Sequence, residues 1–237
     1  MGLKESGLRA SLRNVSTGVI AIPDSENLQS HYVASEIDAS DGDPISTWPD
    51  SSGSFDATGG DPIYREDEIG GEPALEFNSG NQDVFDTGHQ QNTNDPRTMY
   101  FAVRVDGPTN DWARWWGAQD GDNRSYLGAT NDSGYTIVYA DNFTDSGSFP
   151  YGSWHIHSIT AGSGTVEWFD NGSSIDSASY TGQGTLDATD RIGAMDNDGV
   201  RDYIDGYIAE ILRYDVDHDD SARSEVESYL NDKYGVF

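Results

Sequence analysis

The sequence predicts an all-β protein, a two-sheet antiparallel jelly-roll sandwich with a short C-terminal helix and an extended N-terminal arm. Three observations lead to this fold class. Turn signals rich in glycine, asparagine and aspartate recur throughout residues 24–237. Short runs with strand composition lie between these turns. The 237 residues include 6 tryptophans, 13 tyrosines and 8 phenylalanines, enough for one sizeable core in one domain.

Stretches rich in β-branched and aromatic residues identify the expected strands, because such side chains pack well on a pleated surface. They lie at residues 31–37, 74–77, 98–105, 112–118, 125–130, 135–140, 154–161, 165–169, 190–194 and 206–214. The segment TVEWFDNGSSI is typical of a hairpin, since Asn171 and Gly172 tolerate the positive φ angles of a tight turn. Many short strands with glycine-rich turns favour a sandwich or barrel over alternating strands and helices.

One helix is expected within residues 219–235. Aspartate and serine stand at its start, where their side chains can accept from free backbone N–H groups, and Gly235 ends it. Residues spaced three and four apart form one stripe along this helix. The stripe consists of Ala222, Val226, Tyr229, Leu230 and Lys233.

The chain is strongly acidic, with 42 Asp and Glu against 13 Lys and Arg and a formal net charge of −29. This charge would repel nucleic acid, so we expect no nucleic-acid partner. The scarcity of lysine and the even spread of acids favour adaptation to molar salt, and a calcium-loaded protein is the alternative. No apolar run is long enough to insert into a membrane, and no secretory signal is recognisable near the N-terminus.

Residues 1–23 differ from the rest, because they are net basic and contain no aromatic residue. The sequence therefore divides into an arm over 1–23 and a domain over 24–237. Leu8 and Leu12 are four residues apart and would share a face if the arm became helical on binding. Arg9 and Arg13 would pair with carboxylates. We expect this arm to dock onto an acidic neighbour, either a second copy in a homo-oligomer or another protein of a larger particle.

Four segments, in order along the chain, carry a resemblance to a known superfamily. They read HYVASEIDASDGDPISTWPDSSG, YREDEIGGEPALEFN, GSWHIHSITAGSGTVEWFDNGSSI and RIGAMDNDGVRDYIDGYIAEILRYDVDHDDSARSEVESYLNDKYG. The chain resembles the laminin-G-like and concanavalin-A-like lectin and glucanase superfamily over nearly all of 28–237. The resemblance implies a jelly-roll domain in which two antiparallel sheets face each other.

The run EIDASD is similar to the catalytic E-x-D-x-x-E motif of glucanases in that superfamily. Alternation along the expected strand places Glu36 and Asp38 on one face. A retaining glycosidase needs a second carboxyl group about 5–5.5 Å away as the acid. Asp41 would have to supply it, but it lies beyond the strand in a turn and is shorter than the glutamate of the motif. We therefore expect a protein that is not an enzyme.

The segment DWARWWGAQDGDNRSY is the candidate glycan-binding site, because exposed aromatic rings stack on sugar rings. Its aromatic residues are Trp112, Trp115, Trp116 and Tyr126. Alternation along an extended strand turns Trp115 and Trp116 to opposite faces, so at least one of the aromatic residues should lie in the core.

Two loops rich in acidic oxygen atoms are candidate Ca²⁺ sites. Their carboxylates are Asp120, Asp122, Asp196 and Asp198. The resemblance supports them, because relatives bind calcium at loop edges, but an aspartate-rich surface also produces such loops by chance. The run YDVDHDDSARSEVE imitates a calcium loop, but it lacks the glycine and the final glutamate of an EF-hand. His155 and His157 share one strand face, and we expect both to be packing residues.

Two function classes follow. The first is a non-enzymatic surface protein of a halophilic archaeal virus, such as a capsid decoration, turret or tail fibre. It would be docked on other virion proteins through its arm and would bind host surface glycans. The alternative is a free carbohydrate-binding module or glycoside hydrolase of a halophile.

Overall fold

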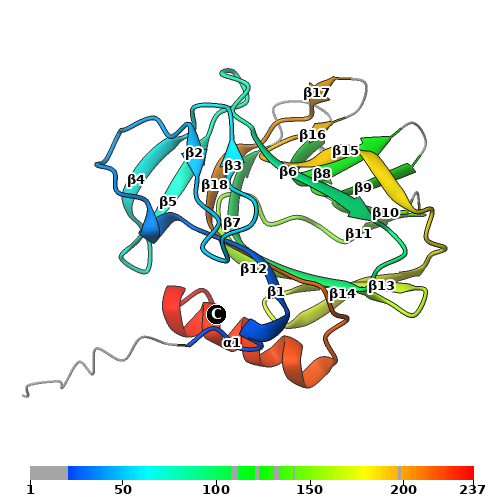
Figure 1. Cartoon of the computed structure of the whole chain (residues 1–237). Coiled ribbons are helices and arrows are strands. Elements are labelled where there is room, and N and C mark those ends of the chain that lie inside the picture. Colours follow the sequence, from blue (N-terminus) through cyan, green and yellow to red (C-terminus); the bar gives the residue numbers. More distant parts are fainter. Residues whose placement is uncertain (1–20, 108–111, 121–122, 131–133, 141, 197–198) are drawn as a thin grey trace, which may run out of the picture.

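The computed structural model describes residues 21–107, 112–120, 123–130, 134–140, 142–196 and 199–237. Within these residues two antiparallel sheets face each other, and one α-helix lies against the outer face of one sheet (Figure 1). The predicted sandwich with a C-terminal helix is confirmed. No helix among the described residues has the length and apolar character needed to cross a membrane.

Sheet A carries the helix. In order across the sheet, its strands are β14 (Ser173–Ser179), β13 (Thr165–Asp170), β12 (Trp154–Gly162), β7 (Arg97–Gly107), β18 (Asp205–Tyr214), β5 (Glu72–Phe77) and β4 (Ile63–Ile69). β1 (Leu28–Val33) pairs with the second half of β18, and β5 pairs with the first half on the same edge. The opposite edge of β18 pairs with β7 along nearly its whole length.

Sheet B forms the other layer. In order, its strands are β11 (Asn142–Ser146), β10 (Tyr135–Tyr139), β9 (Asn123–Thr130), β8 (Trp112–Asp120), β15 (Thr185–Ile192), β6 (Phe85–Asn92), β3 (Ala57–Thr58) and β2 (Thr47–Trp48). A separate small ribbon pairs β16 (Met195–Asp196) with β17 (Val200–Arg201).

Each strand expected from the sequence overlaps an observed one. The turn between β13 and β14 contains Asn171 at φ 49° and Gly172 at φ 76°, which confirms the hairpin. The first expected strand is partly wrong, because β1 ends at Val33 and Ala34–Glu36 form a 3-10 turn. The sequence did not predict β6, because polar side chains such as Thr87 face the interior and satisfy their polar groups there.

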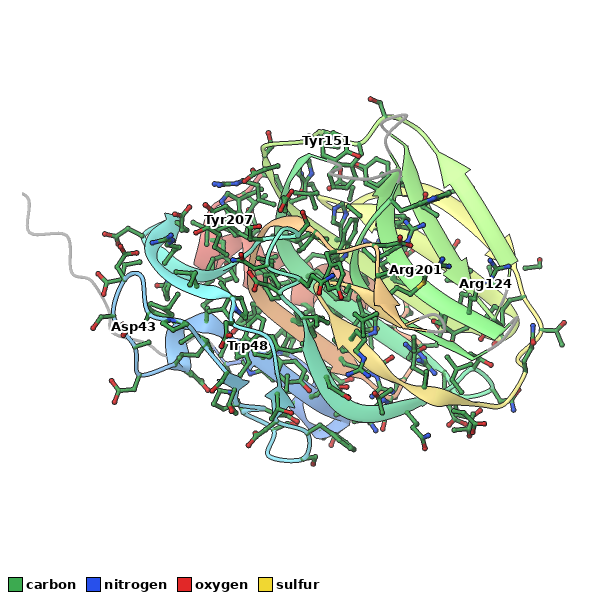
Figure 2. All side chains as sticks on the ribbon, turned by 90° about the horizontal axis from the view of Figure 1, so that it is seen from above. Asp43, Trp48, Arg124, Tyr151, Arg201 and Tyr207 are labelled. Carbon is green, nitrogen blue, oxygen red and sulfur yellow. The ribbon has the colours of Figure 1, made fainter. Side chains whose placement is uncertain are left out.

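Aromatic side chains fill the space between the sheets. Trp48, Trp115, Trp116 and Trp168 are all at most 2% exposed and belong to one cluster. Figure 2 shows Trp48 among the crowded interior side chains, whereas the exposed Asp43 lies at the periphery. Burial of large aromatic surfaces is the main stabilising contribution that such a sandwich can obtain.

The helix α1 (Asp220–Tyr234) has the ends that the sequence predicts. The side chain of Asp219 accepts a hydrogen bond from the backbone N–H of Ala222 at 2.9 Å, and Gly235 adopts the left-handed conformation that ends the helix. Val226 and Leu230 are fully buried against the outer face of sheet A (Figure 1). The predicted stripe is therefore the face that packs.

A buried carboxylate connects the helix to sheet A. Glu210 on β18 is fully buried and accepts from Tyr229 at 3.0 Å, Tyr234 at 2.7 Å and Lys233 at 2.6 Å. His31 on β1 lies 2.7 Å away through Nε2. Burial alone would raise the pKa of Glu210, but the hydrogen bond to His31 and the ammonium of Lys233 outweigh burial and lower it.

The end of the predicted arm contacts the domain. Ile22 packs against the apolar cluster around the helix, and the carbonyl of Pro23 accepts from the Tyr214 hydroxyl at 2.9 Å. Residues 1–20 lie outside the described residues. The arm residues Leu8, Arg9, Leu12 and Arg13 are among them, so the assembly role of the arm stays a prediction.

Candidate functional site

The aromatic segment predicted to bind glycans contributes mainly to the core. Trp115 is 0% exposed and stacks on His157 with ring centroids 5.3 Å apart, and Trp116 is 2% exposed and packs edge-on to Phe101 at 5.9 Å. Both indoles face inward because a register shift between Arg114 and Trp116 interrupts the alternation of β8. The expectation that one aromatic residue is core is confirmed, and the sugar platform is wrong for these two.

The other two aromatic candidates are described only in part. Trp112 is partly exposed, and the guanidinium carbon of Arg114 lies 4.4 Å from its ring centroid. Tyr126 lies on β9, but its side chain is outside the described residues. Glycan binding at Trp112 and Tyr126 therefore stays a prediction.

The candidate calcium carboxylates are placed only in part. Asp120 ends β8 and Asp196 ends β16, but neither side chain is described, and Asp122 and Asp198 lie outside the described residues. Among the described residues, no three His, Asp or Glu side chains are grouped so as to hold a metal ion. Calcium binding stays a prediction.

The carboxylates of the glucanase-like run lie on an exposed loop. Glu36 accepts a hydrogen bond from the Ser51 hydroxyl, and Asp41 lies 3.8 Å from an Arg65 nitrogen. Both residues and Asp38 are exposed. The predicted alternation does not apply to them, because the 3-10 turn ends at Glu36.

The two histidines of β12 pack inside the sandwich. The rings of His155 and His157 stack with centroids 5.7 Å apart. Asp170 lies 2.7 Å from Nδ1 of His155 and accepts from the Tyr135 hydroxyl at 2.6 Å. Burial lowers the pKa of His157 to about 4, so this ring is neutral at physiological pH. These contacts agree with the packing role that the sequence predicts.

Two adjoining pockets open at one end of the sandwich. The turns and connections β6–β7, β12–β13, β14–β15 and β18–α1 meet there, and Pro96 borders both pockets. The tyrosine pocket, of about 360 Å³, is lined by Thr93, Asn94, Ser163, Tyr180, Gly182 and Asp217, among others. The arginine pocket, of about 280 Å³, is lined by Gln29, His89, Asp95, Arg97, Arg213 and Asp215, among others.

Hydrogen bonds between loops hold the tyrosine pocket in shape. The backbone N–H of Thr93 donates to the carbonyl of Gly184 at 2.9 Å, and its hydroxyl accepts from the N–H of Gln183 at 2.9 Å. The N–H of Tyr180 donates to the carbonyl of Gly164 in the β12–β13 turn at 2.8 Å. The partly exposed Tyr180 ring is thereby fixed at the pocket wall.

Glycines let polar side chains lie against the backbone of this pocket. A Cβ atom on Gly162 would overlap with the carboxylate of Asp217, and one on Gly182 would overlap with the side-chain oxygen of Asn94. Burial raises the pKa of Asp217, and the nearby His218 partly opposes this effect. The pocket therefore presents a carboxyl group, an amide and an aromatic ring together.

The arginine pocket is connected to the tyrosine pocket through Tyr139. The Arg97 guanidinium carbon lies 5.3 Å from the centroid of the Tyr139 ring, and Tyr180 packs edge-on to the same ring at 4.7 Å. Arg97 also donates to Gln91 Oε1 at 2.7 Å and to the carbonyl of Asn92. These contacts hold its guanidinium in one orientation.

Sequence reasoning missed both pockets. The residues concerned are far apart in the chain, and no local motif connects Arg97 with Arg213 or Asn94 with Tyr180. The one available signal was the rarity of basic residues in an acidic chain, which makes each arginine a candidate for a specific role.

Comparisons with known proteins give structural likenesses. No family model matches the chain, and no curated protein matches it. Trypanosoma rangeli sialidase in complex with 2,3-difluorosialic acid matches with a TM-score of 0.59 and 14% identity over 90% of this chain and 34% of that chain. The chain thus spans about a third of the length of the sialidase.

A second likeness covers nearly the whole of the matched structure. Domain 4 of AbnA, an extracellular arabinanase from Geobacillus stearothermophilus, in complex with arabinotriose, matches with a TM-score of 0.61 and 18% identity. The match covers 85% of this chain and 98% of that chain. These likenesses show the fold alone: a β-sandwich similar to part of the sialidase and to domain 4 of the arabinanase.

Proposed function

We propose that this protein is a glycan-binding domain that holds a sugar chain in the tyrosine pocket and the arginine pocket. The observation that carries the proposal is the convergence of Tyr180, Asn94 and Asp217 in one pocket at the end of the sandwich. The likeness to the arabinanase domain, whose structure contains arabinotriose, supports it.

The tyrosine pocket offers the chemistry that sugars require. The Tyr180 ring provides an apolar surface for the C–H groups of a sugar ring. The Asn94 amide can donate to and accept from hydroxyl groups, and the Asp217 carboxylate can accept from them. A volume of about 360 Å³ lies within the range of small-ligand pockets and suits one sugar unit.

The proposal includes no catalytic step. Of the glucanase-like carboxylates, Glu36 accepts from Ser51 and Asp41 lies near Arg65. Neither carboxylate lines either pocket. Binding without chemistry is therefore the function that the arrangement of side chains supports best.

The finer prediction of a virion surface protein rests on the acidic composition and the basic arm. The structures named above are carbohydrate-active proteins, and they favour the alternative of a carbohydrate-binding module. A glycan site at the end of the sandwich would serve either role, so the binding experiment comes first.

Isothermal titration with arabinan, galactan, β-glucan and galacturonan oligosaccharides in molar sodium chloride tests the proposal. At least one class should bind, and Tyr180→Ala or Asn94→Ala should weaken binding about tenfold, or about 1.4 kcal/mol. Tyr207→Ala is the matched control, because this partly exposed tyrosine, labelled in Figure 2, lines neither pocket. By strand geometry it lies about 20 Å along β18 from Arg213.

Two results would refute the proposal. The first is the absence of binding to any of these glycans, or binding that the two pocket variants leave unchanged. The second is the release of reducing sugar ends during the incubations, which would identify a hydrolase in place of a binding domain.

A further inference from the structure

Two buried guanidinium groups lie near each other in the arginine pocket. Arg97 is 2% exposed and Arg213 is 4% exposed, and both line the same cavity. Burial, followed by the positive charge of Arg97, lowers the pKa of Arg213 to about 10. The positive charge of Arg97 thus disfavours the charged form of Arg213, and the carboxylates of Asp190 and Asp215 partly oppose this effect.

Among the described residues, neither cation forms an ion pair with a carboxylate. Within the described part of the chain, no carboxylate oxygen lies within 4.0 Å of a nitrogen of Arg97 or Arg213. Other arginines of the described part of the chain, such as Arg65, Arg104 and Arg223, do form ion pairs. In a chain with 42 acidic residues, the missing partner does not reflect a shortage of carboxylates.

A buried charge without a partner is costly, so a folded protein that keeps two such charges together needs a compensating group. The Nε atoms of Arg97 and Arg213 are both buried and have no hydrogen-bond acceptor among the described residues. The buried carboxylate of Asp190, whose charge acts on Arg213, is already engaged by His89 at 3.1 Å and by the Gln91 amide. The charges of Asp190 and Asp215 favour the charged form of Arg213 without forming an ion pair with it, so direct contact with the two guanidinium groups is left to an external anion.

The surroundings restrict the charge of that anion. Asp95 and Asp215 are exposed residues that also line the pocket. Their carboxylates would repel a doubly charged phosphate or sulfate more strongly than a singly charged carboxylate. A carboxylate also matches the planar fork of a guanidinium group, and Arg97 is already held in place by Gln91, Asn92 and Tyr139.

We propose that the arginine pocket binds the carboxylate of an acidic sugar through Arg97 and Arg213. This inference rests on the proposed glycan-binding function and names the class of glycan. The tyrosine pocket holds the neighbouring sugar unit. Pro96 lines both pockets, and the Tyr139 ring contacts both Arg97 and Tyr180. The ligand is thus an acidic oligosaccharide that occupies both pockets at once.

Matched pairs of ligands test this assignment by isothermal titration in molar sodium chloride. The pairs are a galacturonan trisaccharide with its carboxyl-reduced form, and sialyllactose with lactose. The acidic member of at least one pair should bind about tenfold more tightly, or about 1.4 kcal/mol. Arg213→Gln should remove this preference and leave the affinity for the neutral member unchanged.

Arg65→Gln is the control, because Arg65 forms an ion pair with Glu76 and lines neither pocket. Circular dichroism and thermal melting establish that each variant is folded. If Arg213→Gln does not fold, Arg97→Lys keeps the charge, loses the planar fork and should reduce the same preference.

The outcomes separate this inference from the proposed function. Equal affinity for both members of each pair would overturn the acidic-sugar assignment while the glycan-binding function stands. Binding of acetate that depends on Arg213, without binding of any oligosaccharide, would overturn the acidic-sugar assignment and the glycan-binding function together. A preference that persists in Arg213→Gln would also overturn the assignment.

Discussion

Lowering the pH from about 7 to about 4 should destabilise the protein through His157. This side chain is 0% exposed and lies between the rings of Trp115 and His155, with centroids at 5.3 Å and 5.7 Å. Burial lowers its pKa to about 4, and this effect outweighs the opposing influence of Asp170, whose carboxylate lies 3.7 Å from Nδ1.

The size of the effect follows from the two pKa values. The pKa of histidine in an unfolded chain is about 6.5, so between pH 6.5 and pH 4 the unfolded state binds a proton that the folded state excludes. The free energy of unfolding therefore decreases as the pH falls through this window. A difference of about 2.5 pH units at about 1.4 kcal/mol each gives a limiting loss of about 3.5 kcal/mol below both pKa values.

Other titrating groups face His157, and they can be separated from it. His155 shares β12, Asp170 lies on β13, and Tyr135 reaches Asp170 from β10. Burial alone would raise the pKa of Asp170, but the hydrogen bonds with His155 and Tyr135, together with the charge that His157 gains at low pH, outweigh burial and lower it. The stability from Asp170 is thus present above its unfolded pKa near 4 and is lost at lower pH than the His157 contribution.

Urea unfolding followed by tryptophan fluorescence, at pH 7, 6, 5 and 4.5 in fixed molar sodium chloride, provides the measurement. The wild type should lose about 2–3 kcal/mol of unfolding free energy over this range. His157→Asn should be less stable at pH 7 but should show a shallower dependence on pH. Parallel pH dependences of the two proteins would refute the reasoning, because they would show that His157 does not titrate differently on folding.

Three further predictions concern stability. Trp115→Ala should lower the unfolding free energy by about 3–5 kcal/mol in urea titrations and leave glycan affinity unchanged, because the indole is a core group. If the indole were part of a surface sugar platform, the variant would lose glycan affinity and keep its unfolding free energy. Glu210→Gln should cost about 3–5 kcal/mol, because Lys233 loses its buried partner; a change below 1 kcal/mol would show that the cluster does not anchor the helix. The melting temperature should fall as sodium chloride is lowered from about 3 M to about 0.1 M, because charge repulsion grows. A constant melting temperature would contradict adaptation to salt.

Local features could be predicted because the groups that decide them are neighbours in the chain. Asn171 and Gly172 form the β13–β14 turn because both tolerate positive φ angles. Asp219 caps the helix through a residue three positions ahead, and Gly235 ends it through its own backbone freedom. Each of these interactions is complete within a few residues, so the sequence is sufficient to identify it.

The orientation of Trp115 and Trp116 could not be predicted from the local sequence. Alternation along an isolated strand places them on opposite faces, and only the pairing of β8 with β9 reveals the shift that turns both inward. The alternation predicted for the EIDASD run also fails. A 3-10 turn replaces the second half of the expected strand, so Glu36 and Asp38 do not share a strand face.

The sequence by itself determined the fold class, the hairpin and the helix, because periodicity and turn chemistry act over short distances. Tertiary structure alone decided the candidate site. Arg97 opens β7 and Arg213 lies near the end of β18, and the antiparallel register of these strands brings both to one end of the sandwich. Loops from four separate connections complete the pockets there. Such a site depends on pairing between distant segments, for which the order of residues along the chain carries no local signal.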